Sequence, residues 1–519
     1  MSNKNNKKLI LVVLDGWGVA RPQHGNAIGK AKTPTMDMIE RSYYALTLQA
    51  SGIGVGLPWG REGNSEVGHM NLGAGRIVYQ YLPRIVEAIR DGSFFQNEAL
   101  KGAMNFVKNN NSTLHIMGLL SSGNVHSYID HLYALLDMAN KNGIQKVVLH
   151  PFTDGKDSPP HEATTFLKNL RDRMKKQGTG EIGTIVGRAY AMDRNNHWDL
   201  TQKTYELLTQ GKGQKTEDPI SYLENSYEKG LTDFDIEPGV VYKNEKPIGL
   251  IEEGDAVIFF NFREDSARQI TKSFVLSDQE FSEFPRKKIP NIFFVGMTEY
   301  QEDLPIEVAF PPPKIDMPLA EVISNAGLKQ LHIAETEKYA HVTYFFNGQK
   351  ESPLKNEDRI LVPSMGTPHY DDLPEMQAYN ITQQIMKYIR EYDFFLINYA
   401  NADMLGHTGN WDAALKGIEA VDANISSLVK AVEQLDMTMV ITADHGNAEA
   451  MINSRTGAII TQHSINPVPF FIIGNEFKTR NYDHLYNGKP QGVLGDVAPT
   501  VLKIMGIDIP PEMTGKPLI

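Results

Sequence analysis

The segment Thr438-Met439-Val440-Ile441-Thr442-Ala443-Asp444-His445-Gly446 joins an apolar run to an aspartate and a histidine directly behind it. An apolar run of this length predicts a buried strand. The two polar side chains then lie beyond its carboxyl end, where α/β sheets hold their sites. Leu9–Leu14, followed by Asp15, repeats the arrangement near the start of the chain. Together the two segments predict an α/β sheet with a polar site at its carboxyl edge.

Candidate metal ligands extend this site to two more segments. Asp403 and His407 lie four residues apart, so they share one face if the segment is a helical turn. His463 has the weakest local signal, because a lone histidine is more often structural, but it precedes a predicted strand of the same series. Carboxylate and imidazole ligands suit Mn²⁺, Zn²⁺ or Fe²⁺ better than Ca²⁺ or Mg²⁺. With Asp444 and His445 these ligands are too many for one ion, which predicts a two-metal centre for phosphoryl transfer.

Composition limits the classes of partner. The chain has 519 residues, 41% of them hydrophobic and 22% charged, which is typical of a globular protein with two large domains. Its net charge of −12 argues against general binding to nucleic acid or to anionic membranes. An anionic substrate then needs a local basic pocket. The absence of cysteine excludes disulfides and a thiol nucleophile, and it favours a reducing compartment.

The first residues do not predict a signal peptide. The apolar run Leu9–Leu14 ends at Asp15 and is too short for the hydrophobic region of a signal peptide. We therefore expect a first strand preceded by a solvated basic leader. No segment approaches the ~18 apolar residues of a membrane span, so we expect a cytoplasmic protein.

Short apolar runs alternate with helical patterns along the whole chain, which predicts parallel α/β layers. Trp411–Leu435 has apolar residues every three or four positions and is expected to be an amphipathic helix. Thr33 and Pro34 are expected to cap and open an earlier helix. Strands are expected at 113–117, 146–152, 181–186, 256–262, 291–295, 394–399, 437–442 and 469–473, and helices at 128–142, 161–176 and 496–505.

The two ends of the chain carry ligands of one site, so the middle series must be an insertion. We predict a catalytic metal-binding domain formed by residues 1–80 and 314–519, and an inserted α/β substrate-binding domain at residues 81–313. The stretch Phe310-Pro311-Pro312-Pro313 is stiff and extended and suits a hinge. Such an insertion predicts domain closure around the substrate.

Ser65, within Gly63-Asn64-Ser65-Glu66, is the candidate nucleophile. A serine hydroxyl needs a base or a metal to remove its proton. No base stands beside it in the sequence, but a metal bound by Asp15, Asp444 and His445 could hold it as an alkoxide. The segment is also typical of a capped turn entering a helix. Both interpretations are compatible, because a helix N-terminus stabilises a phosphate on that serine.

The middle series carries polar residues just after several of its predicted strands. Arginines on a surface are usually only solvated. Several of them placed after strands favour instead a pocket for phosphate and carboxylate, where the guanidinium makes two-point contacts. The residues of this polar cluster are His126, Asp154, Lys156, Asp157, Arg188, Arg194 and Arg263.

Taken together, the motifs resemble those of the cofactor-independent phosphoglycerate mutases, members of the alkaline phosphatase superfamily. The resemblance covers essentially the whole chain. It is carried by Leu14-Asp15-Gly16-Trp17-Gly18, Gly63-Asn64-Ser65-Glu66-Val67-Gly68-His69, Asn401-Ala402-Asp403-Met404-Leu405-Gly406-His407, Thr442-Ala443-Asp444-His445-Gly446-Asn447 and Met513-Thr514-Gly515.

The resemblance implies interconversion of 3-phosphoglycerate and 2-phosphoglycerate without 2,3-bisphosphoglycerate, through a phosphoserine at Ser65. It implies a monomer with two metal ions, usually manganese. One ion would be held by Asp403, His407 and His463, and the other by Asp15, Ser65, Asp444 and His445. Lys338 would neutralise the transferring phosphoryl group. His126 and Asp157 would handle the glycerate hydroxyls, with Asp157 favoured for the proton, and Arg188, Arg194 and Arg263 would bind substrate.

Two positions depart from the family pattern. Lys156 and Ser266 stand where the family has arginines. Lysine keeps the charge but loses the two-point contact, and serine loses the charge. Arg268 is near in sequence but would lie on the wrong face of a helix. Loss of a charged anchor to substrate commonly costs about 1.5–3 kcal/mol, which predicts weaker or altered substrate binding.

Two other functions stay open at this point. A metal-dependent phosphomonoesterase, or another mutase of the superfamily, would share Ser65 and the metals but would lack the polar cluster. A non-catalytic relative that binds phosphorylated acids is suggested only by Lys156 and Ser266.

Overall fold

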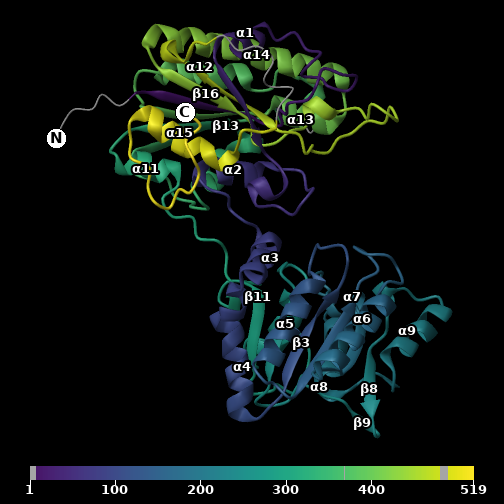
Figure 1. Cartoon of the computed structure of the whole chain (residues 1–519). Helices are drawn as coiled ribbons and strands as arrows, with labels where there is room; N and C mark the ends of the chain where they lie inside the picture. Colours follow the sequence, from purple (N-terminus) through teal and green to yellow (C-terminus); the bar gives the residue numbers. More distant parts are fainter. Residues whose placement is uncertain (1–6, 367–368, 480–488) are drawn as a thin grey trace. The chain divides into compact units, whose positions relative to one another are not determined.

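A computed structural model describes residues 7–366, 369–479 and 489–519, which form two compact α/β units. Unit 1 comprises Met1–Gln80 and Pro313–Ile519, and unit 2 comprises Tyr81–Pro312. Unit 2 is therefore an insertion in the sequence of unit 1, as the colours of Figure 1 make visible. Most of the expected basic leader, residues 1–6, lies outside the described residues.

Unit 1 is built on one sheet with the strand order β14-β13-β15-β1-β16-β17-β2-β18. The strands are β1 (Leu9–Leu14), β2 (Tyr44–Gln49), β13 (Gln330–Glu335), β14 (Glu357–Val362), β15 (Phe394–Tyr399), β16 (Thr438–Thr442), β17 (Val468–Ile473) and β18 (Gly492–Val493). The five strands from β14 to β16 pair in parallel, and β17 is antiparallel to both of its neighbours. Because both faces of a parallel sheet are covered, β1 is apolar and buried at every position.

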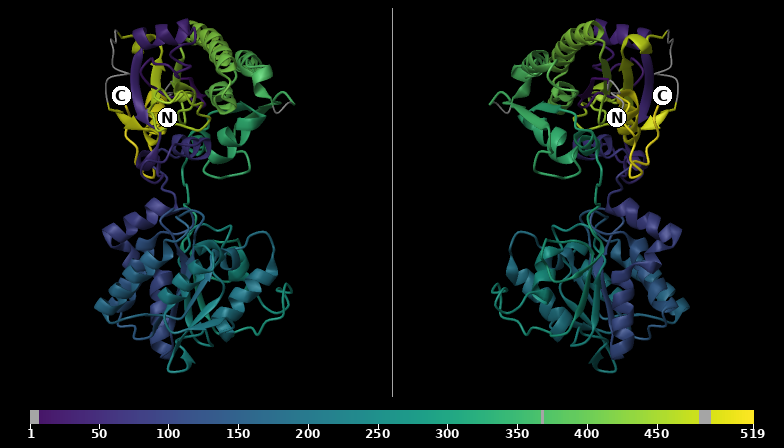
Figure 2. Two further views of the ribbon diagram at one scale, coloured as in Figure 1. Left: turned by 90° about the vertical axis from the view of Figure 1, so that its right-hand side faces the viewer. Right: turned by 90° about the vertical axis from the view of Figure 1, so that its left-hand side faces the viewer.

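Helices cover both faces of this sheet, with α1, α12 and α14 in one layer and α2, α11 and α15 in the other (Figures 1 and 2). They are α1 (Pro34–Ser42), α2 (Ser65–Ala74), α11 (Leu319–Asn325), α12 (Ala378–Tyr388), α13 (Asn401–Thr408), α14 (Trp411–Leu435) and α15 (Val497–Met505). The bounds predicted for α14 are confirmed, because its buried positions recur every three or four residues.

The predicted cap of α1 is only partly right. Pro34 does open the helix, but the Thr33 side chain makes no capping hydrogen bond. The buried Asp422 of α14 takes that role, since its carboxylate accepts hydrogen bonds from Thr35 N at 3.2 Å and from Met36 N at 2.8 Å. A side chain distant in sequence thus satisfies the helix N-terminus.

Unit 2 has a sheet with the strand order β12-β11-β10-β3-β4-β6-β8-β7. Its strands are β3 (Leu114–Leu120), β4 (Val147–Thr153), β5 (Glu181–Ile182), β6 (Thr184–Gly187), β7 (Gln214–Thr216), β8 (Gly239–Lys243), β9 (Lys246–Pro247), β10 (Ala256–Phe259), β11 (Phe293–Thr298) and β12 (Glu307–Phe310). The strand expected at 181–186 is broken at Gly183 into β5 and β6. The strand expected at 256–262 stops at Phe259, and the one expected at 291–295 begins later, at Phe293. Phe310 still belongs to β12, so the proline-rich connection starts at Pro311.

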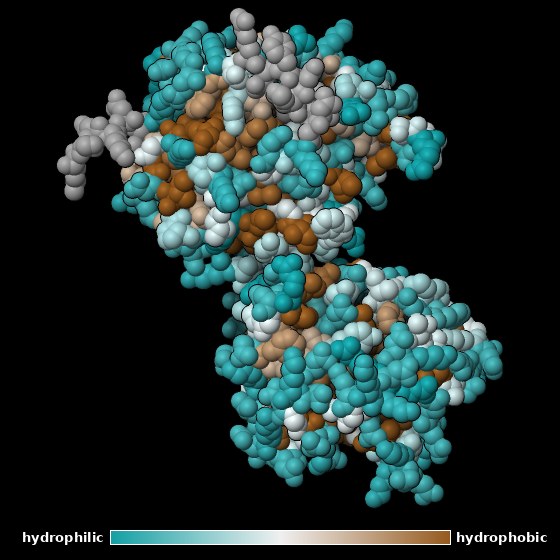
Figure 3. All heavy atoms as spheres, in the orientation of Figure 1, coloured by the Kyte–Doolittle hydropathy of each residue, from teal (hydrophilic) through white to brown (hydrophobic). Residues whose placement is uncertain are grey.

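Two helical layers enclose this second sheet. One hydrophobic core packs under α3 (Tyr81–Asp91), α4 (Glu98–Asn110), α5 (Ile129–Lys141), α6 (Ala163–Gln177) and α9 (Pro219–Glu228), and the other packs under α7 (Arg188–Ala191), α8 (Trp198–Gln210) and α10 (Arg268–Val275). On the face drawn in Figure 3, unit 2 is mainly hydrophilic, whereas unit 1 has several hydrophobic patches. Among the described residues no helix is long and apolar enough to cross a membrane.

Candidate active site

The carboxyl ends of three parallel strands bring the predicted ligands of unit 1 together. β1 lies between β15 and β16. Asp15 directly follows β1, Asp403 lies in the first turn of α13 behind β15, and Asp444 follows β16 by two residues. Adjacent parallel strands end at one edge of a sheet, so these three carboxylates from distant parts of the sequence become neighbours.

Ser65 faces this edge from the first turn of α2. Its neighbour Asn64 caps the helix by accepting a hydrogen bond from Val67 N at 2.9 Å. Ser65 Oγ is buried, 3.2 Å from Asp15 Oδ1 and 3.0 Å from His445 Nε2. No base stands beside Ser65 in the sequence, but the fold brings an imidazole nitrogen from 380 residues away within hydrogen-bond reach.

Lys338 lies at the centre of the same group. It belongs to a short turn, Thr336–Lys338, directly behind β13. Its ammonium lies 2.6 Å from Asp15 Oδ1 and from Asp403 Oδ2, and it donates to Ser65 Oγ at 2.8 Å. Burial opposes the charge on Lys338, but Asp15 and Asp403 outweigh that effect and raise its pKa. Lys338 is thus a permanent cation beside the candidate nucleophile.

His407 and His463 lie on the other side of Asp403. Their Nε2 atoms are 3.3 and 3.2 Å from Asp403 Oδ1 and 2.9 Å from each other. Each Nδ1 faces a backbone carbonyl, Thr461 O at 2.7 Å for His407 and Gly63 O at 2.8 Å for His463. When Nδ1–H donates to a carbonyl, the lone pair of Nε2 is free for a cation, as in histidines that bind metals.

Two groups of three ligand atoms lie within 4.8 Å of one another, Asp403 with His445 and His463, and Asp15 with Asp444 and His445. His445 thus joins both groups. His407 Nε2 also lies 3.3 Å from Asp403 Oδ1 and 2.9 Å from His463 Nε2, so the three residues that the resemblance implied for the first ion lie together as well. Asp444 Oδ2 is buried and has no well-formed hydrogen bond within the described residues, with His69 Nδ1 at 3.3 Å and His445 Nε2 at 3.5 Å. A buried carboxylate oxygen so poorly satisfied is unfavourable unless a cation approaches it. These residues fit divalent cations.

The charges agree with this conclusion. Asp15, Asp403, Asp444 and Lys338 are all buried, and three carboxylates face one ammonium. Burial raises the pKa of Asp15, and the nearby charge of Asp444 raises it further. Burial also opposes ionisation of Asp403, but Lys338 and then the hydrogen bond with His407 lower its pKa. The negative charge that remains is what a divalent cation would neutralise.

Sequence reasoning missed the polar residues that hold the ligands. Asn398 donates to Asp15 Oδ2 at 2.8 Å, and His69 Nε2 lies 3.0 Å from the same amide. Asn447 donates to Asp403 Oδ1 at 2.9 Å, and the buried Glu449 accepts from Asn447 N at 2.8 Å. Asn398 could have been found, because it is a polar residue inside the apolar run Phe394–Tyr399. The other three have no comparable local signal.

In unit 2 the predicted polar residues follow the strands and form ion pairs with one another. Arg188, directly after β6, lies 2.5 Å from Asp154 Oδ1 and 2.6 Å from Asp157 Oδ2. His126 Nε2 lies 3.8 Å from Asp157 Oδ2, and burial together with the charge of Arg188 lowers the pKa of His126 to about 4. The exposed ammonium of Lys156 makes no hydrogen bond or ion pair with the described residues.

Asp265 completes this cluster and was also missed. Its Oδ2 atom pairs with Arg194 and lies 3.0 Å from Nε and 2.9 Å from Nη2 of Arg263, while Oδ1 lies 3.6 Å from His126 Nδ1. Ser266 is buried and donates its backbone N–H to Asp265. Arg268 begins α10 and donates to Tyr300 O, so it does not replace the missing arginine, as expected.

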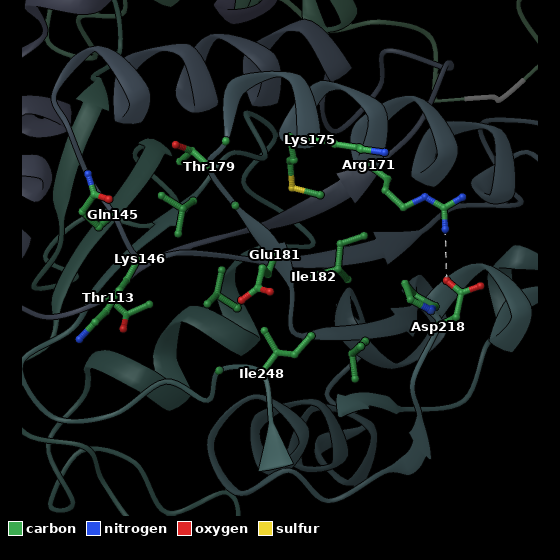
Figure 4. A pocket seen from close by; sticks show the side chains of 18 of the residues that line it. Thr113, Gln145, Lys146, Arg171, Lys175, Thr179, Glu181, Ile182, Asp218 and Ile248 are labelled. Atoms are coloured by element: carbon green, nitrogen blue, oxygen red, sulfur yellow. Dashed lines mark hydrogen bonds and ion pairs between the residues drawn. The ribbon is translucent and has the colours of Figure 1, made fainter. Parts of the chain in front are cut away.

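A cavity of about 740 Å³ in unit 2 lies at the opposite, amino edge of the sheet (Figure 4). Arg171 and Asp218 form an ion pair of 3.5 Å in its wall. The basic side chains of Lys146, Arg171 and Lys175 are balanced by the acidic ones of Glu181, Glu217 and Asp218. The cavity therefore offers no net charge to select a phosphorylated acid, and the polar cluster remains the candidate anion site of unit 2.

Comparison with known proteins divides the chain in the same way. Residues 85–302 match the family described as the N-terminus of BPG-independent PGAM, and residues 328–466 match the type I phosphodiesterase / nucleotide pyrophosphatase family.

Full-length relatives cover both units. The chain is 47% identical to the 2,3-bisphosphoglycerate-independent phosphoglycerate mutase of Clostridium novyi and 48% identical to that of Clostridium acetobutylicum, over 99% of each chain. Among solved structures, crystal structures of Leishmania mexicana phosphoglycerate mutase at low cobalt concentration match with a TM-score of 0.56 and 30% identity. That match covers 99% of this chain and 98% of the other.

Proposed function

The chain belongs to the family of 2,3-bisphosphoglycerate-independent phosphoglycerate mutases, and we propose that it interconverts 3-phosphoglycerate and 2-phosphoglycerate through a phosphoserine at Ser65. The observation that carries the phosphoserine route is the position of Ser65 Oγ, with Lys338 Nζ at 2.8 Å and His445 Nε2 at 3.0 Å. Phosphoryl transfer needs mainly alignment and compensation of charge, and these contacts supply both.

Two divalent ions, manganese in our proposal, complete the site. Asp403, His407 and His463 would hold one, and Asp15, Ser65, Asp444 and His445 the other. When bound, they would supply the charge that favours a deprotonated Ser65 and offsets the charge of the phosphoryl group. The carboxylate and imidazole donors and the excess negative charge support this assignment.

The residues of the chain have separate roles in the proposed reaction. Ser65 Oγ attacks phosphorus, the Oγ–P bond forms, and the bond from phosphorus to the glycerate oxygen breaks. Lys338 stays protonated and compensates the charge on the phosphoryl oxygens. Ser65 enters and leaves the cycle deprotonated, and Asp157 enters and leaves it protonated. Asp157 gives its proton to the glycerate oxygen that leaves and takes one back from the other glycerate hydroxyl, which then receives the phosphoryl group from Ser65.

The polar cluster of unit 2 would bind the glycerate. Arg188, Arg194 and Arg263 can contact phosphate and carboxylate at two points each, and Lys156 adds a further cation. His126 is neutral at pH 7 because its pKa is lowered to about 4, so it would contact a glycerate hydroxyl without charge. Retention of glycerate is what separates a mutase from a phosphatase, because water would otherwise hydrolyse the phosphoserine.

An assay coupled to enolase tests the proposal. The protein loaded with Mn²⁺ and given 3-phosphoglycerate should form 2-phosphoglycerate with little free phosphate. Phosphate release without 2-phosphoglycerate would identify a phosphomonoesterase, and absence of turnover would identify a non-catalytic binding protein. We further propose that the protein is a cytoplasmic monomer, to be tested by cell fractionation and by light scattering.

A further inference from the structure

Glu449 is a buried carboxylate outside the proposed ligand set, and it accepts four hydrogen bonds. It lies in the short helix Ala448–Ala450, just behind Asp444 and His445, and it has no solvent exposure. The donors to Oε2 are Gly18 N at 3.0 Å and Asn447 N at 2.8 Å. The donors to Oε1 are Ser464 Oγ and Asn466 Nδ2, the latter at 3.0 Å. None of the four is a cation.

These donors belong to three of the segments that carry proposed ligands. Gly18 lies three residues after Asp15, and Ser464 directly follows His463. The backbone of Ser464 also donates to Gly446 O at 2.9 Å, which joins the His463 segment to the loop of Asp444 and His445. Through Asn447, whose side chain donates to Asp403 Oδ1, the network reaches the remaining carboxylate. One side chain thus contacts three of the segments that carry proposed ligands, and it reaches the Asp403 segment through Asn447.

The backbone around Glu449 is shaped to admit it. A Cβ atom on Gly18 would lie 2.2 Å from Glu449 Cδ, and one on Gly446 would lie 2.5 Å from Oε1. Real Cβ atoms do not approach this closely, so both positions need glycine for their backbones to reach the carboxylate. The contact is therefore built into both loops, in the motifs Asp15-Gly16-Trp17-Gly18 and Asp444-His445-Gly446.

We propose that Glu449 is a positioning residue that holds the Asp15, Asp444–His445 and His463 segments at the spacing two divalent ions require. Its own oxygens are occupied by four donors, so it acts through the ligands and does not bind an ion itself. Hydrogen-bond partners of metal ligands commonly change metal affinity by about 10- to 100-fold. The inference rests on the proposed metal ligands.

The test is Glu449→Gln, studied by calorimetric titration of the full metal-free chain with Mn²⁺. Glutamine keeps the shape but presents an NH₂ group to donors that need an acceptor. Because Glu449 contacts the neighbours of the proposed ligands and not the ligands themselves, we expect the dissociation constants of both ions to rise by about tenfold, the lower end of that range.

Glu357→Gln is the matched control. Glu357 is also buried in unit 1 and accepts from Leu354 N and Asn347 Nδ2, but it also pairs with Arg359 at 2.6 Å and begins β14, at the amino ends of the strands. Both variants should lower the unfolding temperature of the metal-free protein, whereas only Glu449→Gln should weaken Mn²⁺ binding.

The number of bound ions tests the two-metal proposal, and their dissociation constants test the role of Glu449. Fewer than two Mn²⁺ ions on the wild-type chain would contradict the two-metal proposal itself. Two ions on the wild type with unchanged constants in Glu449→Gln would overturn the role of Glu449. If Glu449→Gln does not fold, Ser464→Ala is the alternative, because it removes a single donor to Glu449. This variant should weaken the binding of only the Mn²⁺ ion beside His463. Unchanged Mn²⁺ binding at that site would also overturn the proposed role of Glu449.

Discussion

The two polar clusters of this protein differ in what balances their charge. In unit 1 three buried carboxylates face one lysine, and imidazole nitrogens point at the same space, so the cluster has a deficit of positive charge. In unit 2 each of the arginines 188, 194 and 263 already pairs with a carboxylate of its own cluster. Unit 1 is therefore preorganised for cations, whereas an anionic substrate in unit 2 must compete with Asp154, Asp157 and Asp265.

The side-chain exposure of the two clusters differs as well. Lys338 has 5% of its side chain exposed, whereas Arg194 and Arg263 have 46% and 45%; Arg188, at 7%, is the buried arginine of the unit 2 cluster. Buried charges are screened little, so each loss in unit 1 should be severe, while exposed pairs in unit 2 should contribute modestly. The predictions below test this contrast, beginning with the largest expected effect.

Ser65→Ala should abolish mutase turnover, by at least about a thousandfold, because no other group can accept the phosphoryl group in the proposed reaction. Incubation of the wild type with substrate followed by intact-mass measurement should show one phosphoryl group that the variant lacks. Ser226→Ala is the control, since Ser226 is a buried helix serine that only donates to Tyr222 O. Unchanged turnover in Ser65→Ala would refute the phosphoserine route.

Lys338→Met should leave Asp15 and Asp403 buried without their cation. Breaking a buried ion pair on one side typically costs about 3–5 kcal/mol, so the metal-free variant should lose stability of that order in urea unfolding. Lys350→Met removes a half-exposed partner of Glu321 and should cost about 1 kcal/mol or less. Equal losses of stability in the two variants would show that the buried charge of Lys338 contributes no more than an exposed ion pair.

Asp265→Asn should strengthen substrate binding, and this gain should be smaller than the losses expected for Ser65→Ala and Lys338→Met. Removal of the carboxylate that pairs with Arg194 and Arg263 frees them for substrate, so KM for 3-phosphoglycerate should fall about two- to fivefold with kcat nearly unchanged. Glu264→Gln, which removes an exposed partner of Arg268, is the control. A rise in KM would mean instead that Asp265 holds the arginines in their binding positions.

His131→Phe should change only the acid end of the stability curve. Both ring nitrogens of His131 are buried without hydrogen-bond partners among the described residues, and burial lowers its pKa to about 3. The unfolded chain binds this proton near pH 6.5, so the wild type loses stability as pH falls from about 6.5 to about 3. The variant should lose less over this range. Urea unfolding of the metal-free proteins at pH 7 and pH 4.5 measures this loss of stability. Equal losses in the wild type and the variant would contradict the lowered pKa of His131.

Most of the candidate metal site could be predicted from the sequence because its candidate ligands follow strong local patterns. Asp15 and Asp444 each come after an apolar run, and Asp403 and His407 have helical spacing. Each segment can therefore be recognised as a candidate ligand segment from its own local pattern. The predicted bounds agree with the structure at Leu9–Leu14 and Phe394–Tyr399. They failed at 256–262, where the chain leaves the sheet early to present Arg263.

Other residues could not be predicted, because their partners come from distant parts of the chain. The amino-acid sequence by itself determined the α/β class, the insertion pattern and the ligand types, since periodicity and residue chemistry are local properties. Only the tertiary structure decided that His445 lies beside Ser65, that Asp265 occupies the arginines, and that Glu449 joins three ligand loops. The contact of Asp265 with Arg194 spans 71 residues, that of His445 with Ser65 spans 380, and that of Glu449 with Gly18 spans 431. How strands and loops pack brings these partners together, and no single segment encodes that packing.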